Sequence, residues 1–260
     1  MTLDTFGLEL TNNSKVGWAF SLPRNKTCIN ATSICKGLCY GNGIRYQSDA
    51  QQSKRERNYR TAQFLLNKGG KALLAENLTM IIDSARPRDW LVSKATDSPC
   101  TVPWTLRIHD VGDFYSLDYT AAWIIAIKER PECSFWFYTR SFLDEPLLQL
   151  LTELASLPNC QGWLSADKHN HMMSVRAYVK SPETWKVALL QDNDLPSQVA
   201  LSLKEKISPT NIINFPHHRG RYHVEPLKGI TACPAVLGTY KLSTNQNAPR
   251  PCQQCKYCLP

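Results

Sequence analysis

The sequence predicts an α/β fold with mainly parallel strands, arranged as a partial (β/α) barrel, and three observations lead to this prediction. Short apolar segments alternate with segments of helix length, which is typical of βαβ units. Polar residues gather where several apolar segments end, as they do at the ligand-binding edge of parallel sheets. The chain has 260 residues, 43% of them hydrophobic, so it can bury one large core. About five or six strands are expected, which suits a partial barrel better than a closed eightfold one.

The first part of the chain predicts two consecutive helices. Apolar residues recur at helical spacing over residues 47–71 and again over residues 73–85, and Gly69 and Gly70 separate the two stretches. Pro87 ends the second helix. Residues 104–109 then predict a buried strand that leads into a polar loop at residues 110–115.

The same unit recurs in the rest of the chain. The expected helices and strands are helices at residues 117–129, 145–157 and about 182–191, and strands at residues 134–139, 162–165, 198–202 and 211–215. We expect the partial barrel to occupy residues 1–228. From Gly229 onward the chain is rich in Pro, Asn, Gln and Cys and shows no periodicity, so residues 229–260 are expected to form a cysteine-rich extension ordered by bound metal.

The charge and the cysteine content indicate the class of protein. A formal charge of +8 and a pI near 9.0 favour association with nucleic acid, other polyanions or acidic membrane surfaces. The N-terminal stretch does not resemble a signal peptide, and no segment reaches the roughly 20 apolar residues of a membrane span. We therefore expect a cytoplasmic protein that does not enter the membrane, in which ten cysteines indicate metal or redox chemistry rather than disulfides.

The N-terminal cysteine group consists of Cys28, Cys35 and Cys39, which have C-x6-C-x3-C spacing after the apolar segment 16–22. Three thiolates on a short loop can hold three irons of a [4Fe–4S] cluster and leave the fourth iron open to a substrate or cofactor. Two alternatives remain. One is a zinc ion completed by a distant residue, and the other is a set of buried cysteines that pack as small hydrophobes.

The C-terminal cysteine group has a fourth member upstream of a C-x2-C-x2-C run, and it consists of Cys233, Cys252, Cys255 and Cys258. Repeated C-x2-C spacing is typical of an iron–sulfur cubane, and four cysteines would complete its coordination. Tetrahedral zinc is the main alternative. The site is expected to be structural or an electron relay. Three cysteines without a cysteine nearby in the sequence are assigned no role: Cys100, Cys133 and Cys160.

A dense group of titratable residues follows the strand at residues 104–109. His109, Asp110 and Asp113, together with Arg140 after the next strand, are the expected catalytic residues of a ligand site. The alternative is that His109 is a core histidine and that Asp110 or Asp113 caps the following helix. The residues expected on or near this rim are Arg107, His109, Asp110, Asp113, Tyr138, Arg140, Ser141, Ser165, Asp167, His169, His217 and His218.

Four segments together resemble the phage and plasmid gene product 88 family. They are the three-cysteine run at residues 27–40, the run Arg-Ile-His-Asp-Val-Gly-Asp-Phe-Tyr-Ser at 107–116, the run Phe-Trp-Phe-Tyr-Thr-Arg-Ser at 135–141, and the terminal cysteines. The resemblance covers most of the chain. The layout of that family is similar to that of radical S-adenosylmethionine (SAM) enzymes, which have a partial α/β barrel, a three-cysteine loop after the first strand and a glycine-acid turn after the second.

The resemblance implies roles for particular residues. The N-terminal cysteine group would bind a cluster with one open iron, Gly112 and Asp113 would bind the amino group of SAM, and Tyr40 and Tyr115 would flank the ligand. In radical SAM enzymes an electron from the reduced cluster cleaves the sulfonium and gives a deoxyadenosyl radical. The C-terminal cysteine group would hold an auxiliary cluster. The usual spacing is C-x3-C-x2-C and the usual turn is Gly-Gly-Glu, whereas this chain has C-x6-C-x3-C and Val-Gly-Asp.

Three functions follow from these patterns. The first is a radical SAM-like iron–sulfur enzyme with an unknown substrate and an electron donor such as a ferredoxin or flavodoxin. The second is a non-catalytic, metal-stabilised protein that binds nucleic acid through the basic run 54–57 with Arg60, or through residues 217–223. A solvated helix face is the alternative for the basic run. The third is an electron-transfer or redox-sensing protein.

Overall fold

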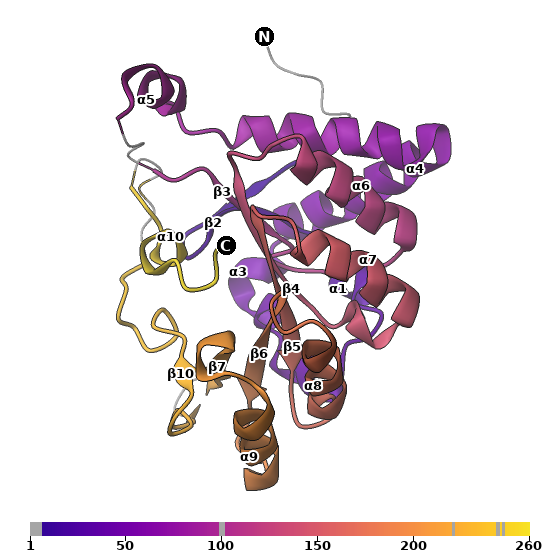
Figure 1. Ribbon diagram of the computed structural model, residues 1–260. Coiled ribbons are helices and arrows are strands. Elements are labelled where there is room, and N and C mark those ends of the chain that lie inside the picture. Colours follow the sequence, from indigo (N-terminus) through magenta and orange to yellow (C-terminus); the bar gives the residue numbers. More distant parts are fainter. Residues whose placement is uncertain (1–6, 99–101, 220–221, 243–244, 246–247) are drawn as a thin grey trace.

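The computed structural model describes residues 7–98, 102–219, 222–242, 245 and 248–260. Within these ranges eight strands form one sheet (Figure 1). In spatial order they are β1 (Thr11–Asn13), β2 (Gly17–Phe20), β3 (Thr105–Ile108), β4 (Ser134–Thr139), β5 (Cys160–Ala166), β6 (Trp185–Gln191), β7 (Ile212–Pro216) and β10 (Thr231–Ala232). Neighbouring strands from β2 to β10 are parallel, and β1 pairs antiparallel with β2. The predicted α/β fold with a mainly parallel sheet is therefore confirmed, and the sheet is open, with β1 and β10 at its edges.

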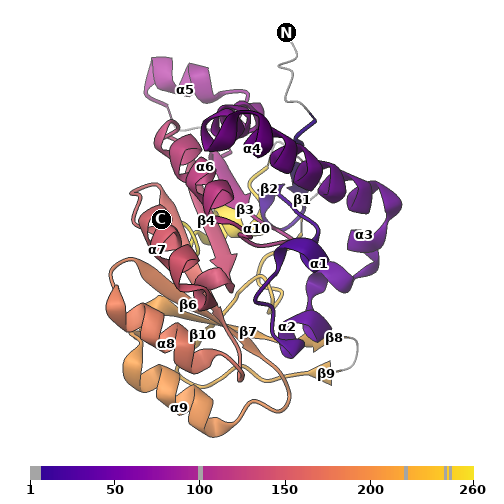
Figure 2. The same cartoon turned by 90° about the vertical axis from the view of Figure 1, so that its right-hand side faces the viewer.

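The longer helices cover one face of this sheet, as Figure 2 shows. They are α4 (Asp49–Ser84), α6 (Leu117–Lys128), α7 (Glu145–Ala155), α8 (His171–Lys180) and α9 (Ser197–Lys206). The shorter elements are α1 (Arg24–Thr27), α2 (Ser33–Leu38), η1 (Tyr40–Asn42), α3 (Ile44–Gln47), α5 (Trp90–Thr96), η2 (Ser141–Leu143), η3 (Pro209–Asn211), the hairpin β8 (His218–Arg219) and β9 (Tyr222–His223), and α10 (Pro251–Cys255).

Alternate residues of each strand point to the helix-covered face and form the main core. Leu106, Phe135, Phe137 and Leu164 are fully buried there and belong to one cluster with helix residues such as Trp123. Burying an apolar side chain of this size contributes roughly 1.5–3 kcal/mol relative to leaving it exposed. This layer therefore supplies most of the hydrophobic stabilisation of the fold.

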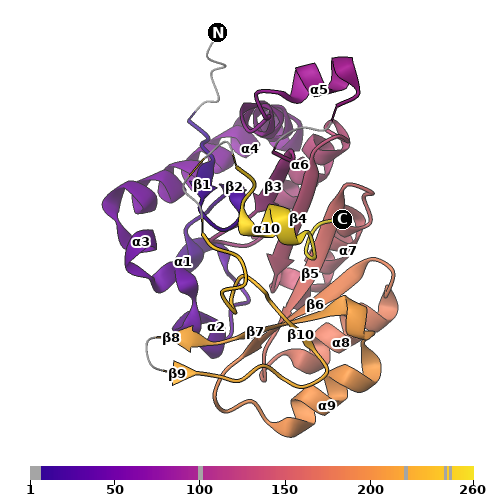
Figure 3. The ribbon, with the colours of Figure 1, turned by 90° about the vertical axis from the view of Figure 1, so that its left-hand side faces the viewer.

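The other face of the sheet is covered by the C-terminal segment, seen in Figure 3 as the yellow chain with α10 in front of β3 and β4. Trp136 and Ala19 pack with Cys252 and Leu259, and Trp163 packs with Tyr257. Gln253 is buried and donates to the Thr105 hydroxyl at 3.0 Å. The sheet is thus buried on both faces, which is typical of mainly parallel sheets.

The predicted break between two helices at Gly69 and Gly70 is confirmed. Helical geometry runs on both sides of this point in α4, but Gly69 and Gly70 have non-helical dihedral angles, and φ of Gly70 is +66°. A positive φ is readily adopted by glycine because it lacks a Cβ atom. The two arms of α4 can therefore follow different directions along the core.

Two expected elements are wrong. The helix expected at about residues 182–191 is strand β6, and the strand expected at residues 198–202 lies inside helix α9. β6 is covered on both faces and so lacks the polar alternation that marks a half-buried strand. In α9 the buried residues are Val199, Ala200 and Leu203, too few to give a clear helical period. Helix α8 was not expected.

No helix within the described ranges is both long enough and apolar enough to cross a membrane.

Candidate functional site

The carboxyl ends of β2 to β5 meet at one edge of the sheet, and the loops that follow them bring distant residues together. The N-terminal cysteine group follows β2, Asp113 follows β3, Arg140 follows β4 and Asp167 follows β5. Because parallel strands end on the same edge, this arrangement is the one expected from the sequence. These loops form the candidate site.

Short helices give the N-terminal cysteine group its local structure. The Cys28 N–H donates to the Arg24 carbonyl at 3.0 Å and ends α1. Thr32 caps α2 by accepting from the Cys35 N–H at 3.1 Å, which is the usual role of threonine at this position. Cys39 follows the last residue of α2. The loop therefore has a defined backbone at each cysteine.

The three thiols of this group lie within electrostatic reach of one another. Burial raises the pKa of the Cys28 thiol well above its usual range, and Asp113, Cys35 and Cys39 raise it further. Burial also raises the pKa of Cys35, whereas the Arg140 guanidinium, which faces this sulfur, lowers it. The Gly112 backbone N–H has the same lowering effect on Cys28. The Arg140 guanidinium and the Gly112 N–H each favour the thiolate, which is the form of cysteine that binds metal.

Asp113 is held in place by its hydrogen bonds. Its carboxylate accepts from the Thr139 hydroxyl at 2.7 Å, from the Arg140 N–H at 2.7 Å and from the Phe114 N–H at 2.8 Å. Burial raises its pKa to about 6, and these hydrogen bonds oppose the rise. Asp113 thereby joins the loop after β3 to the end of β4. Its predicted contact with the SAM amino group stays a prediction.

Gly112 has a geometric reason to be glycine. Its φ is +100°, and a Cβ atom at this position would lie 2.7 Å from the Leu22 Cβ and 3.0 Å from the Leu22 carbonyl oxygen. Side chains rarely adopt this backbone conformation, and here there is no space for one. The close approach brings the loop after β3 against the start of the cysteine segment.

Asp110 links β1, α3 and the cysteine segment. Its carboxylate accepts from Asn13 at 2.8 Å, from the Tyr46 hydroxyl at 3.2 Å and from the Tyr40 hydroxyl at 3.3 Å. Arg107 donates to the Tyr40 hydroxyl at 3.1 Å. The Tyr40 hydroxyl end is therefore buried among charged partners and its pKa is raised by burial, although 49% of the residue's surface is exposed. Tyr40 directly follows Cys39 in the sequence, and its expected contact with a ligand stays a prediction.

The His109 side chain points into the aromatic core. Its Nε2 atom lies 2.7 Å from the Tyr119 hydroxyl, and its ring contacts Phe114 and Trp123 edge to face. Burial and the nearby Arg107 lower its pKa to about 3, so the imidazole is neutral at physiological pH. His109 therefore lies where a core histidine would, which was the alternative to a catalytic role. A catalytic role for His109 stays untested.

Tyr115 lies against helix α4 and not beside the cysteine group. Its ring stacks on Tyr119 with centroids 4.6 Å apart and meets Tyr59 of α4 edge to face at 5.3 Å. Burial raises its pKa. The structure therefore brings Tyr40, but not Tyr115, to the expected ligand position.

A polar chain that the sequence patterns do not predict fixes the cysteine loop to the sheet. Thr32 donates to Asp167 at 2.5 Å, and Asp167 forms a buried ion pair with Arg140 at 3.2 Å. Arg140 also donates to the Ser165 carbonyl at 2.5 Å. The spacing Thr-x-x-Cys at residues 32–35 is a capping signal, but it does not indicate the distant partner Asp167.

The C-terminal cysteine group gathers on the face of the sheet that the C-terminal segment covers. Cys252, Cys255 and Cys233 all interact electrostatically with Cys258. Burial raises the pKa of Cys252 to about 11 and that of Cys258 to about 12, and the cations Lys15 and Arg107 oppose the rise for Cys252. The Tyr138 hydroxyl donates to the Cys258 sulfur at 2.9 Å. Arg107 stacks over the Tyr138 ring with its central carbon 4.8 Å from the centroid.

Cys133 and Cys160 do not join either cysteine group. Cys133 and Cys160 are buried in the main core, and Cys100 lies outside the described residues. The side chains of His218 and His223 also lie outside the described part of the chain. Within that part, no three His, Cys, Asp or Glu side chains are arranged to hold a single metal ion. Metal binding by either cysteine group therefore stays a prediction.

Comparison with known proteins identifies the family. The model of the family described as gene product 88 matches residues 4–259. The gene 88 protein of Mycobacterium phage L5 is 30% identical over 132 residues, which cover 49% of this chain and 50% of that protein. The gene 88 protein of Mycobacterium phage D29 is 32% identical over 162 residues, or 61% of each chain. The chain therefore matches only about half to three fifths of the length of these relatives.

No solved structure matches the chain significantly. The comparisons give no support for the likeness to radical SAM enzymes, whereas the resemblance to the phage family extends over almost every residue. The chain belongs to the gene product 88 family.

Proposed function

We propose that the protein is an iron–sulfur protein with radical SAM-like activity. In this proposal the N-terminal cysteine group holds an open-site [4Fe–4S] cluster, and the C-terminal cysteine group holds a second metal centre. The sheet supports this proposal because β2 to β7 follow one another in chain order, all parallel, with the long helices on one face. This is the connectivity of a partial (β/α) barrel.

The observation that carries the proposal is the surroundings of the N-terminal cysteine group. Its three thiols interact electrostatically at the carboxyl edge of the sheet, where the Gly112 N–H favours the ionised form of Cys28 and Arg140 that of Cys35, both against the effect of burial. Hydrogen-bond donors and cations around cluster sulfurs stabilise the negative charge of a thiolate-bound cluster. A cubane spreads its thiolates over separate irons, so the three sulfurs need not meet at one point.

The residues around this group would orient it. Thr32 and Asp167 fix the start of α2, and Arg140 connects that helix to the end of β5. Asp110 positions the Tyr40 hydroxyl beside the loop. A bound cluster with an open iron would supply an electron for cleavage of SAM. The role of this chain's own residues is to hold the loop over the strand ends and to keep Cys28 and Cys35 out of bulk water.

The second centre is supported by the side chains beneath the C-terminal cysteine group. Tyr138 donates to the Cys258 sulfur, and Lys15 and Arg107 lie close enough to Cys252 to favour its thiolate. Positive charge and a sulfur hydrogen bond suit a thiolate-rich centre of either kind, an iron–sulfur cluster or zinc. Buried on one face of the sheet, this centre would be structural or would relay electrons.

The experiment is metal and sulfide analysis of protein purified without oxygen, with optical and EPR spectra before and after SAM is added. Two centres predict about eight irons and eight sulfides per chain if both are cubanes, and about four of each with one zinc if the tail holds zinc. Reduction in the presence of SAM should then yield 5′-deoxyadenosine. Cys35→Ala should abolish the SAM-dependent change, whereas the buried core variant Cys133→Ala should retain it. A reducible cluster that neither cleaves SAM nor responds to it spectroscopically would contradict the SAM assignment.

A second candidate function is electron transfer or redox sensing without SAM. It is favoured by Arg107, which contacts Tyr40 beside one cysteine group and Tyr138 beside the other. One cation thus contacts a tyrosine beside each of the two groups. This function predicts two reducible centres, electron exchange with a ferredoxin or flavodoxin, and no 5′-deoxyadenosine.

A further inference from the structure

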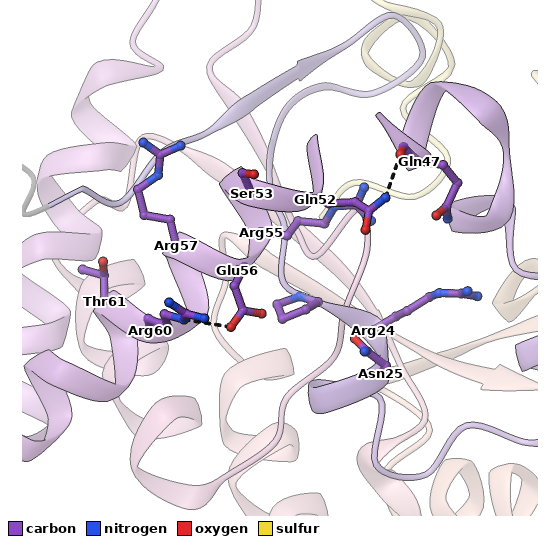
Figure 4. A pocket seen from close by; sticks show the side chains of 11 residues that line it. Arg24, Asn25, Gln47, Gln52, Ser53, Arg55, Glu56, Arg57, Arg60 and Thr61 are labelled. Carbon is purple, nitrogen blue, oxygen red and sulfur yellow. Dashed lines mark hydrogen bonds and ion pairs between the residues drawn. The ribbon is translucent and has the colours of Figure 1, made fainter. Parts of the chain in front are cut away.

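A polar groove separates α1 from the first half of α4, and it lies next to the cysteine loop without including any cysteine (Figure 4). Its volume is about 700 Å³. The residues that line it are Pro23, Arg24, Asn25, Gln47, Gln52, Ser53, Arg55, Glu56, Arg57, Arg60 and Thr61. We refer to it as the arginine groove. Ligand pockets commonly measure 300–1,000 Å³, so this groove could accept a molecule of nucleotide size.

The groove carries an excess of positive charge. Four of its lining residues are arginines and one is a glutamate, which gives a formal charge of +3. Glu56 already accepts from Lys26 at 2.6 Å and from Arg60 at 2.9 Å, and these contacts lower its pKa. The single carboxylate of the lining is thus fully engaged, and it cannot neutralise the other arginines.

Two of these arginines, Arg24 and Arg55, form no ion pair or hydrogen bond with an acidic side chain of the described chain, although the charge of Asp110 acts favourably on Arg55. Arg55 is buried and donates to the backbone carbonyls of Gln51 and Tyr46. The Arg24 guanidinium forms no hydrogen bond or ion pair with any residue of the described chain, and its charge acts unfavourably on Arg55. Figure 4 shows both side chains along the groove, Arg24 from α1 and Arg55 from α4. An anion between them would relieve this repulsion and use guanidinium donors that are now unpaired.

We propose that the arginine groove binds a phosphate-bearing ligand, recognised through its phosphates. Arginine forks match phosphate oxygens two at a time, and Asn25, Gln52 and Ser53 add neutral hydrogen-bonding groups. The lining contains no aromatic ring, so it offers no stacking surface for a base. Recognition should therefore depend strongly on salt and weakly on base identity.

The position of the groove gives this ligand a place in the molecule. Arg24 and Asn25 belong to α1, and the Arg24 carbonyl receives the N–H of Cys28. A ligand held by α1 would thus contact the helix that begins the cysteine loop. The inference does not require a metal, because no lining residue is a cysteine, and its failure would leave the iron–sulfur proposal untouched.

The test is a titration of the purified protein with a nucleoside monophosphate, the matching nucleoside, inorganic phosphate and a labelled single-stranded oligonucleotide. The nucleotide should bind and the nucleoside should not. Arg24→Gln should weaken nucleotide binding about tenfold, as expected for the loss of a charge-assisted hydrogen bond. Arg176→Gln on the exposed surface of α8 makes the same charge change away from the groove and should have little effect.

Glu56→Gln is a variant that should strengthen nucleotide binding. Removal of the one carboxylate of the lining frees Arg60 and Lys26, so nucleotide binding should become several-fold tighter, which misfolding would not produce. Binding of the oligonucleotide in competition with the nucleotide would identify nucleic acid as the phosphate source, and binding of the nucleotide alone would identify a small ligand. Equal binding of nucleoside and nucleotide, equal weakening by Arg24→Gln and Arg176→Gln, or no binding of any phosphate probe would overturn the proposal.

Discussion

His109 and Asp113 lie in the same loop, and burial favours the neutral form of both, but hydrogen bonds oppose this effect at Asp113. The His109 imidazole is neutral, and its ring belongs to the aromatic core. The Asp113 carboxylate is surrounded by three hydrogen-bond donors that support its ionised form. Titratable residues at the end of a strand can therefore serve the fold, and their presence alone does not identify catalytic groups.

The neutral state of His109 predicts a loss of stability in acid. The imidazole has a pKa of about 3 in the folded protein and of about 6.5 when unfolded, so only the unfolded chain gains a proton between these values. Stability should therefore fall as the pH decreases below 6.5, and His109 should account for about 2 kcal/mol of this loss at pH 5.

The check is urea unfolding of wild type and His109→Asn at pH 7 and pH 5. Asparagine suits the left-handed backbone at this position, where φ is +63°. The variant should be less stable at pH 7, and the difference should shrink by about 2 kcal/mol at pH 5. A constant difference at the two pH values would show that the folded imidazole takes up a proton.

Gly112→Ala should destabilise the protein by about 3 kcal/mol. Alanine is strained at this positive φ, and its methyl group would also clash with the Leu22 backbone. A Cβ there would lie 3.0 Å from the Leu22 carbonyl oxygen, which cannot move aside like a side chain. Gly37→Ala is the matched control, since a Cβ at Gly37 in α2 meets nothing within 4 Å. Thermal unfolding followed by circular dichroism measures both, and equal stability of the two variants would be inconsistent with the close approach.

At the level of elements, α4 shows how a glycine pair redirects a helix. Gly70 has φ +66° and ψ −162°, a region populated almost solely by glycine, and a Cβ there would meet no neighbouring atom. Gly70→Ala should therefore cost about 2 kcal/mol through backbone strain alone. Urea unfolding measures this cost, with Lys71→Ala as the control. If Gly70→Ala instead stabilises the protein, the two arms of α4 join as one continuous helix.

Sequence patterns located some elements of the fold and missed others. The glycine break in α4 and the strands β3, β4 and β7 were located correctly. β6 was taken for a helix because helices cover one of its faces and the C-terminal segment lies on the other, so no polar alternation remains. Helix α8 has four buried residues among charged and polar ones, a weak period for a sequence argument.

The candidate site was predictable to the extent that it depends on chain order. The cysteine loop after β2 and the polar ends of β3 and β4 share one edge, as parallel strands require. The contact between Thr32 and Asp167 joins residues 135 positions apart and has no local signature. Spacing identifies candidate ligands, whereas three-dimensional packing decides which polar groups support them.

At the level of the whole molecule, the long helices cover one face of the sheet and the C-terminal segment covers the other. Gln253 is its main polar attachment, since it donates to Thr105 and to the Pro103 carbonyl and accepts from the Arg250 N–H. Gln253→Leu keeps the size of the side chain but leaves these groups unpaired. It should cost about 2–3 kcal/mol, the usual penalty for unsatisfied buried groups.

This variant should also loosen the segment enough for trypsin to cut after Lys256 faster than in wild type. Gln254→Leu is the control, because Gln254 is exposed and its side chain donates to the Pro249 carbonyl within the same segment. Cleavage followed by mass spectrometry distinguishes the two positions. Equal cleavage of both variants would mean that apolar packing, and not Gln253, holds the segment.

Removal of metal also tests how the C-terminal segment is held on the sheet. If the C-terminal cysteine group holds a metal centre, a strong chelator should expose Trp136 and Trp163, which pack against Cys258 and its neighbours. Tryptophan emission should then shift to longer wavelength, and the melting temperature should fall. Unchanged emission from protein shown to have lost its metal would place the centre elsewhere.

The C-terminal residues that cover one face of the sheet are synthesised long after strand β2. The Cys252 N–H donates to the Lys15 carbonyl just before β2, so a ribosome must add 237 residues between the two partners of this hydrogen bond. At 5–20 residues per second, β2 waits roughly 10–50 s for its partner. From their own synthesis until that of α10, Trp136 and Trp163 have no cover on their face. The nascent chain should therefore bind chaperones, and release from them should coincide with the synthesis of α10.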